Sequence, residues 1–176
     1  MYKFFKTGAL CAALLLTAAD AGAARRKPLK LSAANIDEIV AAMTHEEKAN
    51  LIVGMSRSFS DAERIGAGAA GTTYPVERLG ITPVVFADGP AGVRIDPRRE
   101  GDEKTYFCTG VPIGTLLAAS WNDELVADVG AVIGNEAKEY GVDVLLAPGL
   151  NIMRNPLCGR NFEYYSEDPL LAGKIA

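Results

Sequence analysis

The chain has 176 residues, of which 49% are hydrophobic and 23% are charged, with a net charge of −4. This composition is typical of a folded globular protein with a sizeable core, and it excludes a disordered tail or a fibrous repeat. The negative charge, with no basic run beyond residues 25–27, argues against nucleic-acid binding.

The first 23 residues have the pattern of a secretory signal. A short positive region precedes an apolar run at residues 8–19, which is too short for a membrane span, and a small-x-small cleavage site ends at Ala23. We therefore expect residues 24–176 to be exported to the periplasm or the extracellular space, with no membrane span. A lipoprotein modified at Cys11 is the alternative, although no small residue precedes that cysteine.

Patterns for metals and cofactors are weak. The single His and three Cys show no CxxC spacing, so we expect no metal site. Residues 66–71 read G-x-G-x-x-G, but no convincing strand precedes them and Pro75 would disrupt a following helix. Residues 54–74 are therefore predicted to be a loop, and no cofactor is expected. An oxidising compartment would permit Cys108 and Cys158 to pair, and their spacing leaves that pairing open.

Two short helices are predicted near the start of the exported part. Residues 35–43 place apolar side chains at helical spacing. Thr44 and Glu47 form a capping box for a second helix that should run to Val53. His45, in the first turn of that helix, is expected at the surface.

The middle of the chain predicts a parallel strand–helix–strand unit. Residues 81–86 are expected to form a buried strand that ends at an Asp-Gly-Pro turn, followed by a charged surface loop at 95–107. Residues 122–140 form the best helix, and residues 142–147 are expected to form a second buried strand. The apolar stripe of the helix is predicted to contain Leu125, Val129, Val132, Ile133, Ala137 and Tyr140.

The segment after the second predicted strand is the strongest candidate for a site. Residues 151–169 gather Arg, Glu, Asn, Asp and Tyr side chains at the carboxyl end of a parallel strand, where α/β folds keep their sites. Such side chains suit a sugar, because they offer partners for hydroxyls and ring faces for C–H surface. Composition alone favours a solvated loop of ion pairs.

Four stretches of the chain resemble the N-terminal part of glycoside hydrolase family 3, the β-glucosidase and β-xylosidase family. They are residues 88–94, 117–121, 141–148 and 155–169, and the last of these is long and specific. The resemblance implies an α/β fold that is the first part of a (β/α)8 TIM-like barrel. It also implies hydrolysis of O-glycosidic bonds, with release of terminal β-D-glucose from a β-linked oligosaccharide or glycoside by a retaining mechanism.

The resemblance assigns roles to three residues by position. Asp88 is similar to the family's substrate carboxylate, which accepts hydrogen bonds from non-reacting sugar hydroxyls. Arg160 is similar to the Arg that binds the terminal sugar, and Arg94 to the basic residue close to that carboxylate. Glu163 and Arg154 are expected to order the loop rather than bind sugar.

The resemblance places the family's catalytic groups downstream of Ala176. These are an Asp nucleophile in a Ser-Asp-Trp motif and a Glu acid/base, so no catalytic residue is expected within this chain. We therefore interpret residues 24–176 as a truncated barrel domain that is inactive alone and comes from an exported glycosidase. The alternatives are β-xylosidase specificity, and a non-enzymatic sugar-binding or degenerate protein. The oligomeric state stays open.

Overall fold

The computed structural model describes residues 28–56, 68–99 and 101–176. The predicted signal at residues 1–23, Cys11 and the start of the glycine-rich motif lie outside the described residues. Within the described ranges, every helix is too short or too polar to cross a lipid bilayer.

The first two helices form a small unit of their own. Helices α2 (Ile36–Ala42) and α3 (His45–Val53) agree with the prediction, and the Thr44–Glu47 capping box is present. His45 is exposed, as expected. The helices are tied to the 3-10 turn η1 (Glu77–Leu79) by Arg78, whose Nε donates to Glu47 Oε1 at 2.7 Å. The apolar cluster between them is built on Ile39, Met43, Val76 and Leu79.

A four-stranded sheet runs through the centre of the chain in the order β1-β2-β3-β4. Strands β1 (Met55–Ser56) and β2 (Gly71–Thr72) pair with each other in antiparallel fashion, and β2 pairs in the same way with β3 (Val85–Asp88). The prediction of a continuous loop over residues 54–74 was therefore wrong at both ends. Gly71 permits the pairing, because a Cβ there would lie 3.0 Å from the Met55 carbonyl oxygen.

Strand β3 begins and ends later than predicted, at 85–88 instead of 81–86. Pro83 has no N–H to contribute to a ladder, and Ile81 instead bridges back to Val76. The strand begins where the Val85 N–H donates to Asp143 Oδ2 at 2.8 Å and the Val85 carbonyl accepts from the Asp143 N–H at 3.0 Å. Asp88 is thus the last residue of the strand rather than part of the turn.

The parallel unit is confirmed. Helices α5 (Gly114–Ala119) and α6 (Asp123–Glu139) connect β3 to β4 (Val144–Leu146), and the two strands pair in parallel with Asp88 opposite Leu146. Strand β4 was wrongly expected to be buried, since Val144 is 38% and Leu146 is 45% exposed. Among the described residues β4 is an edge strand, so a neighbouring strand pairs with only one of its two hydrogen-bonding edges.

The buried face of α6 differs from the predicted stripe. Leu125 and Val132 are exposed, at 45% and 42%. The face that packs on the rest of the fold consists of Val126, Val129, Ile133 and Ala137. The predicted stripe is thus correct at Val129, Ile133 and Ala137 and wrong at Leu125 and Val132, and Val126 packs on the core although it was not predicted to.

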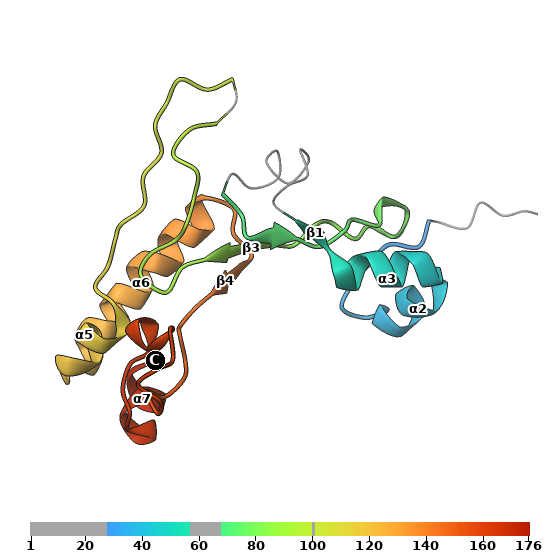
Figure 1. Cartoon of the computed structure of the whole chain (residues 1–176). Coiled ribbons are helices and arrows are strands. Elements are labelled where there is room, and N and C mark those ends of the chain that lie inside the picture. Colours follow the sequence, from blue (N-terminus) through green and yellow to red (C-terminus); the bar gives the residue numbers. More distant parts are fainter. Residues whose placement is uncertain (1–27, 57–67, 100) are drawn as a thin grey trace, which may run out of the picture.

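Figure 1 shows the sheet in the middle, with α2 and α3 at one end and α5 and α7 (Pro169–Ile175) at the other. The described residues on either side of position 100 project away from the rest as a long loop, in agreement with the charged loop expected at 95–107. The C-terminal helix α7 packs with α5 and α6 around Leu117, Ala118, Tyr165, Ala172 and Ile175. This arrangement leaves the carboxyl ends of β3 and β4 beside the polar segment that contains the turn η2 (Asn161–Glu163).

Candidate functional site

Asp88 lies on the face of the sheet that points away from α6. Side chains alternate along a strand, so Ala87 and Leu145 face α6 while Asp88 and its partner Leu146 face the opposite side. Ala87 is fully buried, whereas the Asp88 carboxylate is 46% exposed. The strand thus fixes the backbone of Asp88 and leaves its carboxylate free to meet a ligand.

The turn that follows β3 brings Arg94 back to Asp88. The Arg94 N–H donates to the Asp88 carbonyl at 2.8 Å, and Arg94 Nη1 lies 3.4 Å from Asp88 Oδ2. Gly92 has φ +116°, a conformation that side chains rarely adopt, and the turn depends on it. The result is a carboxylate and a guanidinium side by side at the carboxyl end of the strand.

Arg160 reaches the same region from the segment after β4. Its Nε donates to Glu163 Oε1, and this hydrogen bond raises the pKa of the Arg160 guanidinium. The side chain of Glu163 is 13% exposed and that of Arg160 is 72% exposed. A nearly buried carboxylate therefore fixes the Nε end of an exposed guanidinium group. Gly149 lets the turn after β4 approach, because a Cβ there would lie 2.5 Å from the Glu163 carbonyl oxygen.

These groups line one pocket of about 640 Å³. Asp88 and Arg94 form one part of its wall, and Arg160 and Glu163 form another. Its apolar wall consists of Ile113, Leu146 and Phe162. The pocket therefore combines hydrogen-bond donors and acceptors with apolar surface, which is what a small polyhydroxylated ligand requires.

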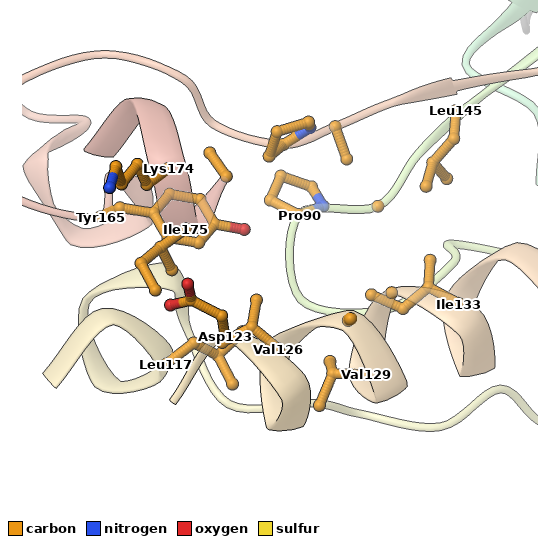
Figure 2. A pocket seen from close by; sticks show the side chains of 16 residues that line it. Pro90, Leu117, Asp123, Val126, Val129, Ile133, Leu145, Tyr165, Lys174 and Ile175 are labelled. Carbon is orange, nitrogen blue, oxygen red and sulfur yellow. The ribbon is translucent and has the colours of Figure 1, made fainter. Parts of the chain in front are cut away.

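A second pocket, of about 370 Å³, lies on the α6 side of the strands (Figure 2). Aliphatic side chains of α6 and Leu145 make up most of its wall, and Asp123, Tyr165 and Lys174 add polar groups. Gly89 and Pro90 line both spaces. This second pocket lacks the carboxylate–guanidinium pairs of the first.

Sequence reasoning identified Asp88, Arg94 and Arg160, and the structure brings all three into one pocket. The loop-ordering role expected for Glu163 agrees with its hydrogen bond to Arg160, although Glu163 also lines the pocket. The apolar wall was missed. Leu146 could have been found from the strand register, because it faces the same side as Asp88, whereas no sequence signal pointed to Ile113.

The described cysteines and acidic residues form no further centre. Cys108 and Cys158 are both free thiols, which answers the question that their spacing left open. Over residues 28–56, 68–99 and 101–176, no group of three or more His, Cys, Asp or Glu side chains is placed to hold a metal ion.

The fold and the pocket together define an α/β segment whose polar site lies at the carboxyl ends of parallel strands. Residues 30–176 match the model of the glycosyl hydrolase family 3 N-terminal domain. The chain therefore belongs to glycosyl hydrolase family 3.

Several relatives of this chain are named β-glucosidases. Thermostable β-glucosidase B of Acetivibrio thermocellus is 43% identical over 149 residues, which are 82% of this chain and 18% of that protein. β-Glucosidase A of Butyrivibrio fibrisolvens is 41% identical over 146 residues, which are 80% of this chain and 16% of that protein. The structure of β-glucosidase 3B from Thermotoga neapolitana in complex with α-D-glucose superposes with a TM-score of 0.72 and 56% identity, over 80% of this chain and 20% of that one. The chain thus spans less than a fifth of the length of these two curated relatives.

Proposed function

We propose that this chain supplies the sugar-binding part of an enzyme that releases terminal β-D-glucose from β-glucosides. The observation that carries the proposal is the convergence of Asp88, Arg94 and Arg160 on one pocket at the ends of β3 and β4. In this proposal, residues 24–176 form the opening part of a (β/α)8 barrel, and the parallel β3–α6–β4 unit is its repeating element. The β-glucosidase names of the relatives support the choice of substrate.

The three side chains divide the recognition of a sugar between them. The Asp88 carboxylate accepts hydrogen bonds from hydroxyls, and the guanidinium groups of Arg94 and Arg160 donate to hydroxyl oxygens. Hydrogen bonds that involve a charged group are roughly twice as strong as neutral ones. The apolar wall gives the C–H face of the sugar ring a surface to pack on, so that binding fixes the ring as well as its hydroxyls.

The carboxylates of this pocket suit binding better than covalent chemistry. Glycoside hydrolysis with retention needs two carboxyl groups about 5–5.5 Å apart, one as nucleophile and one as acid/base. Asp88 is held beside Arg94, and Glu163 is hydrogen-bonded to Arg160. Both carboxylates are therefore engaged by guanidinium groups, and we assign the nucleophile and the acid/base to other parts of the enzyme.

The proposal is tested by Asp88→Ala in the protein expressed from the complete reading frame that contains residues 30–176. Interactions with non-reacting hydroxyls strengthen as the sugar flattens toward its transition state, so their loss lowers kcat/KM. One charge-assisted hydrogen bond contributes roughly 1.5–3 kcal/mol. We expect kcat/KM for 4-nitrophenyl β-D-glucoside to fall by about 10- to 150-fold, the factor that corresponds to this range.

Glu103→Ala is the matched control, because it removes an exposed carboxylate from the projecting loop. It is expected to leave kcat/KM unchanged. An unchanged kcat/KM for Asp88→Ala would remove Asp88 from the site. Comparison of kcat/KM for the aryl β-xyloside and the aryl β-glucoside decides the sugar specificity. A wild-type protein that hydrolyses neither substrate would contradict the proposal.

We further propose that the protein is exported, as the pattern of residues 1–23 supports. Expression in a bacterial host and sequencing of the amino terminus of the secreted protein test this. A mature protein that begins near Ala24 is the expected result, and retention of Met1 in the cytoplasm would contradict it.

A further inference from the structure

The turn that carries Arg94 is supported from behind by a segment far along the loop. The carbonyl oxygen of Thr109 lies where the side chain of residue 92 would be, 2.2 Å from an ideal Cβ on Gly92. The Val111 N–H donates to the Ala91 carbonyl at 3.0 Å. Residues 109–111 therefore form a backing for the turn at residues 89–93.

Helix α6 holds this backing segment through one carboxylate. Glu136 Oε1 and Oε2 accept from the Thr109 N–H at 3.1 and 2.9 Å, and Oε1 also accepts from the Thr109 hydroxyl at 2.7 Å. Tyr140, one turn further along α6, donates from its hydroxyl to the Phe107 carbonyl at 2.7 Å. The second half of the loop is thus hydrogen-bonded to the helix region at two residues, Phe107 and Thr109. Glu136 makes the bonds that lie nearest the turn.

The two sides of the turn are also linked through the core. Val93, next to Arg94, is buried in the same apolar cluster as Ala137, and Cys108 packs against that cluster. A shift of the backing segment therefore reaches Arg94 both through Gly92 and through Val93. Asp88 is less affected, because strand pairing with Leu146 fixes its backbone.

We propose that Glu136 is a positioning residue for the sugar pocket, which rests on the proposed function. By fastening Thr109 to α6, Glu136 fixes the turn that places the Arg94 guanidinium beside the Asp88 carboxylate. It lies outside the pocket lining and acts on the ligand only through this chain of contacts.

The first test measures the turn itself, by amide hydrogen exchange read by mass spectrometry in the protein from the complete reading frame. Glu136→Ala removes all three bonds to Thr109. We expect exchange in peptides covering residues 88–94 and 109–111 to become roughly tenfold faster, as when a charge-assisted hydrogen bond that limits local opening is lost. Peptides covering α2 and α3 serve as the internal reference.

Asp128→Ala is the matched control. It removes an exposed carboxylate from the same helix, about two turns before Glu136. We expect it to leave exchange in the turn unchanged. Equal exchange in Glu136→Ala and the wild type would overturn the proposal, whatever the activity of the protein.

The second test separates positioning from general stability. A purely structural role lowers the amount of active protein and leaves KM as it was, whereas a displaced Arg94 weakens sugar binding. We expect Glu136→Ala to raise KM for the aryl β-glucoside about three- to tenfold, with a smaller change in kcat. An unchanged KM in an active variant whose turn exchanges faster would overturn the positioning role.

Two substitutions of Thr109 test the hydrogen bond between its hydroxyl and Glu136. Thr109→Ser keeps the hydroxyl that Glu136 binds and is expected to retain the wild-type KM, while Thr109→Val loses that bond and should give an intermediate KM. Equal KM values for the two variants would contradict the role of this bond. A wild-type protein without glycosidase activity would refute the proposed function, and the exchange experiment would still decide whether Glu136 fixes the turn.

Discussion

Gly92→Ala tests the turn behind Arg94 most directly. Two separate penalties act at this position. The first is conformational: φ is +116°, and a residue with a side chain held in such a region costs about 1–3 kcal/mol. The second is steric, because the new Cβ would lie 2.2 Å from the Thr109 carbonyl oxygen, a backbone atom that cannot rotate away.

The size of the steric penalty depends on how much it costs to move Thr109 away from the new Cβ. Thr109 is held by Glu136, so relief of the clash costs part of a charge-assisted interaction of roughly 1.5–3 kcal/mol. Together the two penalties amount to at most about 2.5–6 kcal/mol, a large share of the stability of a typical domain. Urea unfolding followed by circular dichroism measures this difference, and KM for the aryl glucoside should rise in whatever fraction stays folded.

Two other glycines separate the penalties. Gly101 has φ +77° with no atom within 4 Å of its ideal Cβ, so Gly101→Ala reports conformational strain alone. Gly134 lies inside α6 with the same open surroundings, and Gly134→Ala should stabilise the helix by about 0.5–1 kcal/mol. The reasoning is refuted if Gly92→Ala unfolds at the same urea concentration as the wild type, or costs no more than Gly101→Ala.

Two further predictions concern protonation. Burial, with Glu136 and Glu139 nearby, raises the pKa of the Cys108 thiol to about 11, so its alkylation by iodoacetamide should be slow at pH 8 and keep accelerating above pH 9; a rate that levels off near pH 8.5 would contradict this. The hydrogen bond from Arg78, aided by the Thr44 N–H, lowers the pKa of Glu47 from 4.5 to about 2. The unfolded chain therefore takes up this proton first, and the stabilisation is complete above pH 4.5 and lost as the pH falls toward 2. Thermal unfolding from pH 6 to 2 should show a smaller loss of Tm in Glu47→Gln than in the wild type, and parallel curves would refute the assignment.

Local chemistry made part of this fold predictable. The Thr44–Glu47 capping box and the Asn122 cap of α6 act within one turn of helix, so a short stretch of sequence contains all the partners. The parallel β3–α6–β4 unit was predictable for a similar reason, since apolar runs and helix length are local patterns. The rule that polar residues after parallel strands meet at one edge of the sheet pointed to the segment after β4, whereas the family resemblance supplied the individual residues Asp88, Arg94 and Arg160.

Contacts between distant residues explain what was missed. Strand β3 starts at Val85 because Asp143, 58 residues away, receives its N–H, and no local pattern contains that information. The exposure of Leu146 depends on what covers the face of the sheet opposite α6, which the pattern of strand β4 does not contain. The hold of Glu136 on Thr109 is likewise invisible in sequence, because both residues read as ordinary surface positions.

Contacts within the projecting loop hold its two ends together, so the conformation at the ends does not depend on the residues near the tip. The Tyr106 N–H donates to the Pro97 carbonyl at 2.9 Å, and the Arg99 guanidinium lies 3.8 Å from the Tyr106 ring centroid. The two ends of the loop are therefore already together, while no atom lies within 4 Å of an ideal Cβ on Gly101. Lengthening such a loop costs only about 0.6 kcal/mol per doubling. We therefore expect a short peptide tag inserted after Gly101 to leave the spacing of Asp88 and Arg94 as it is.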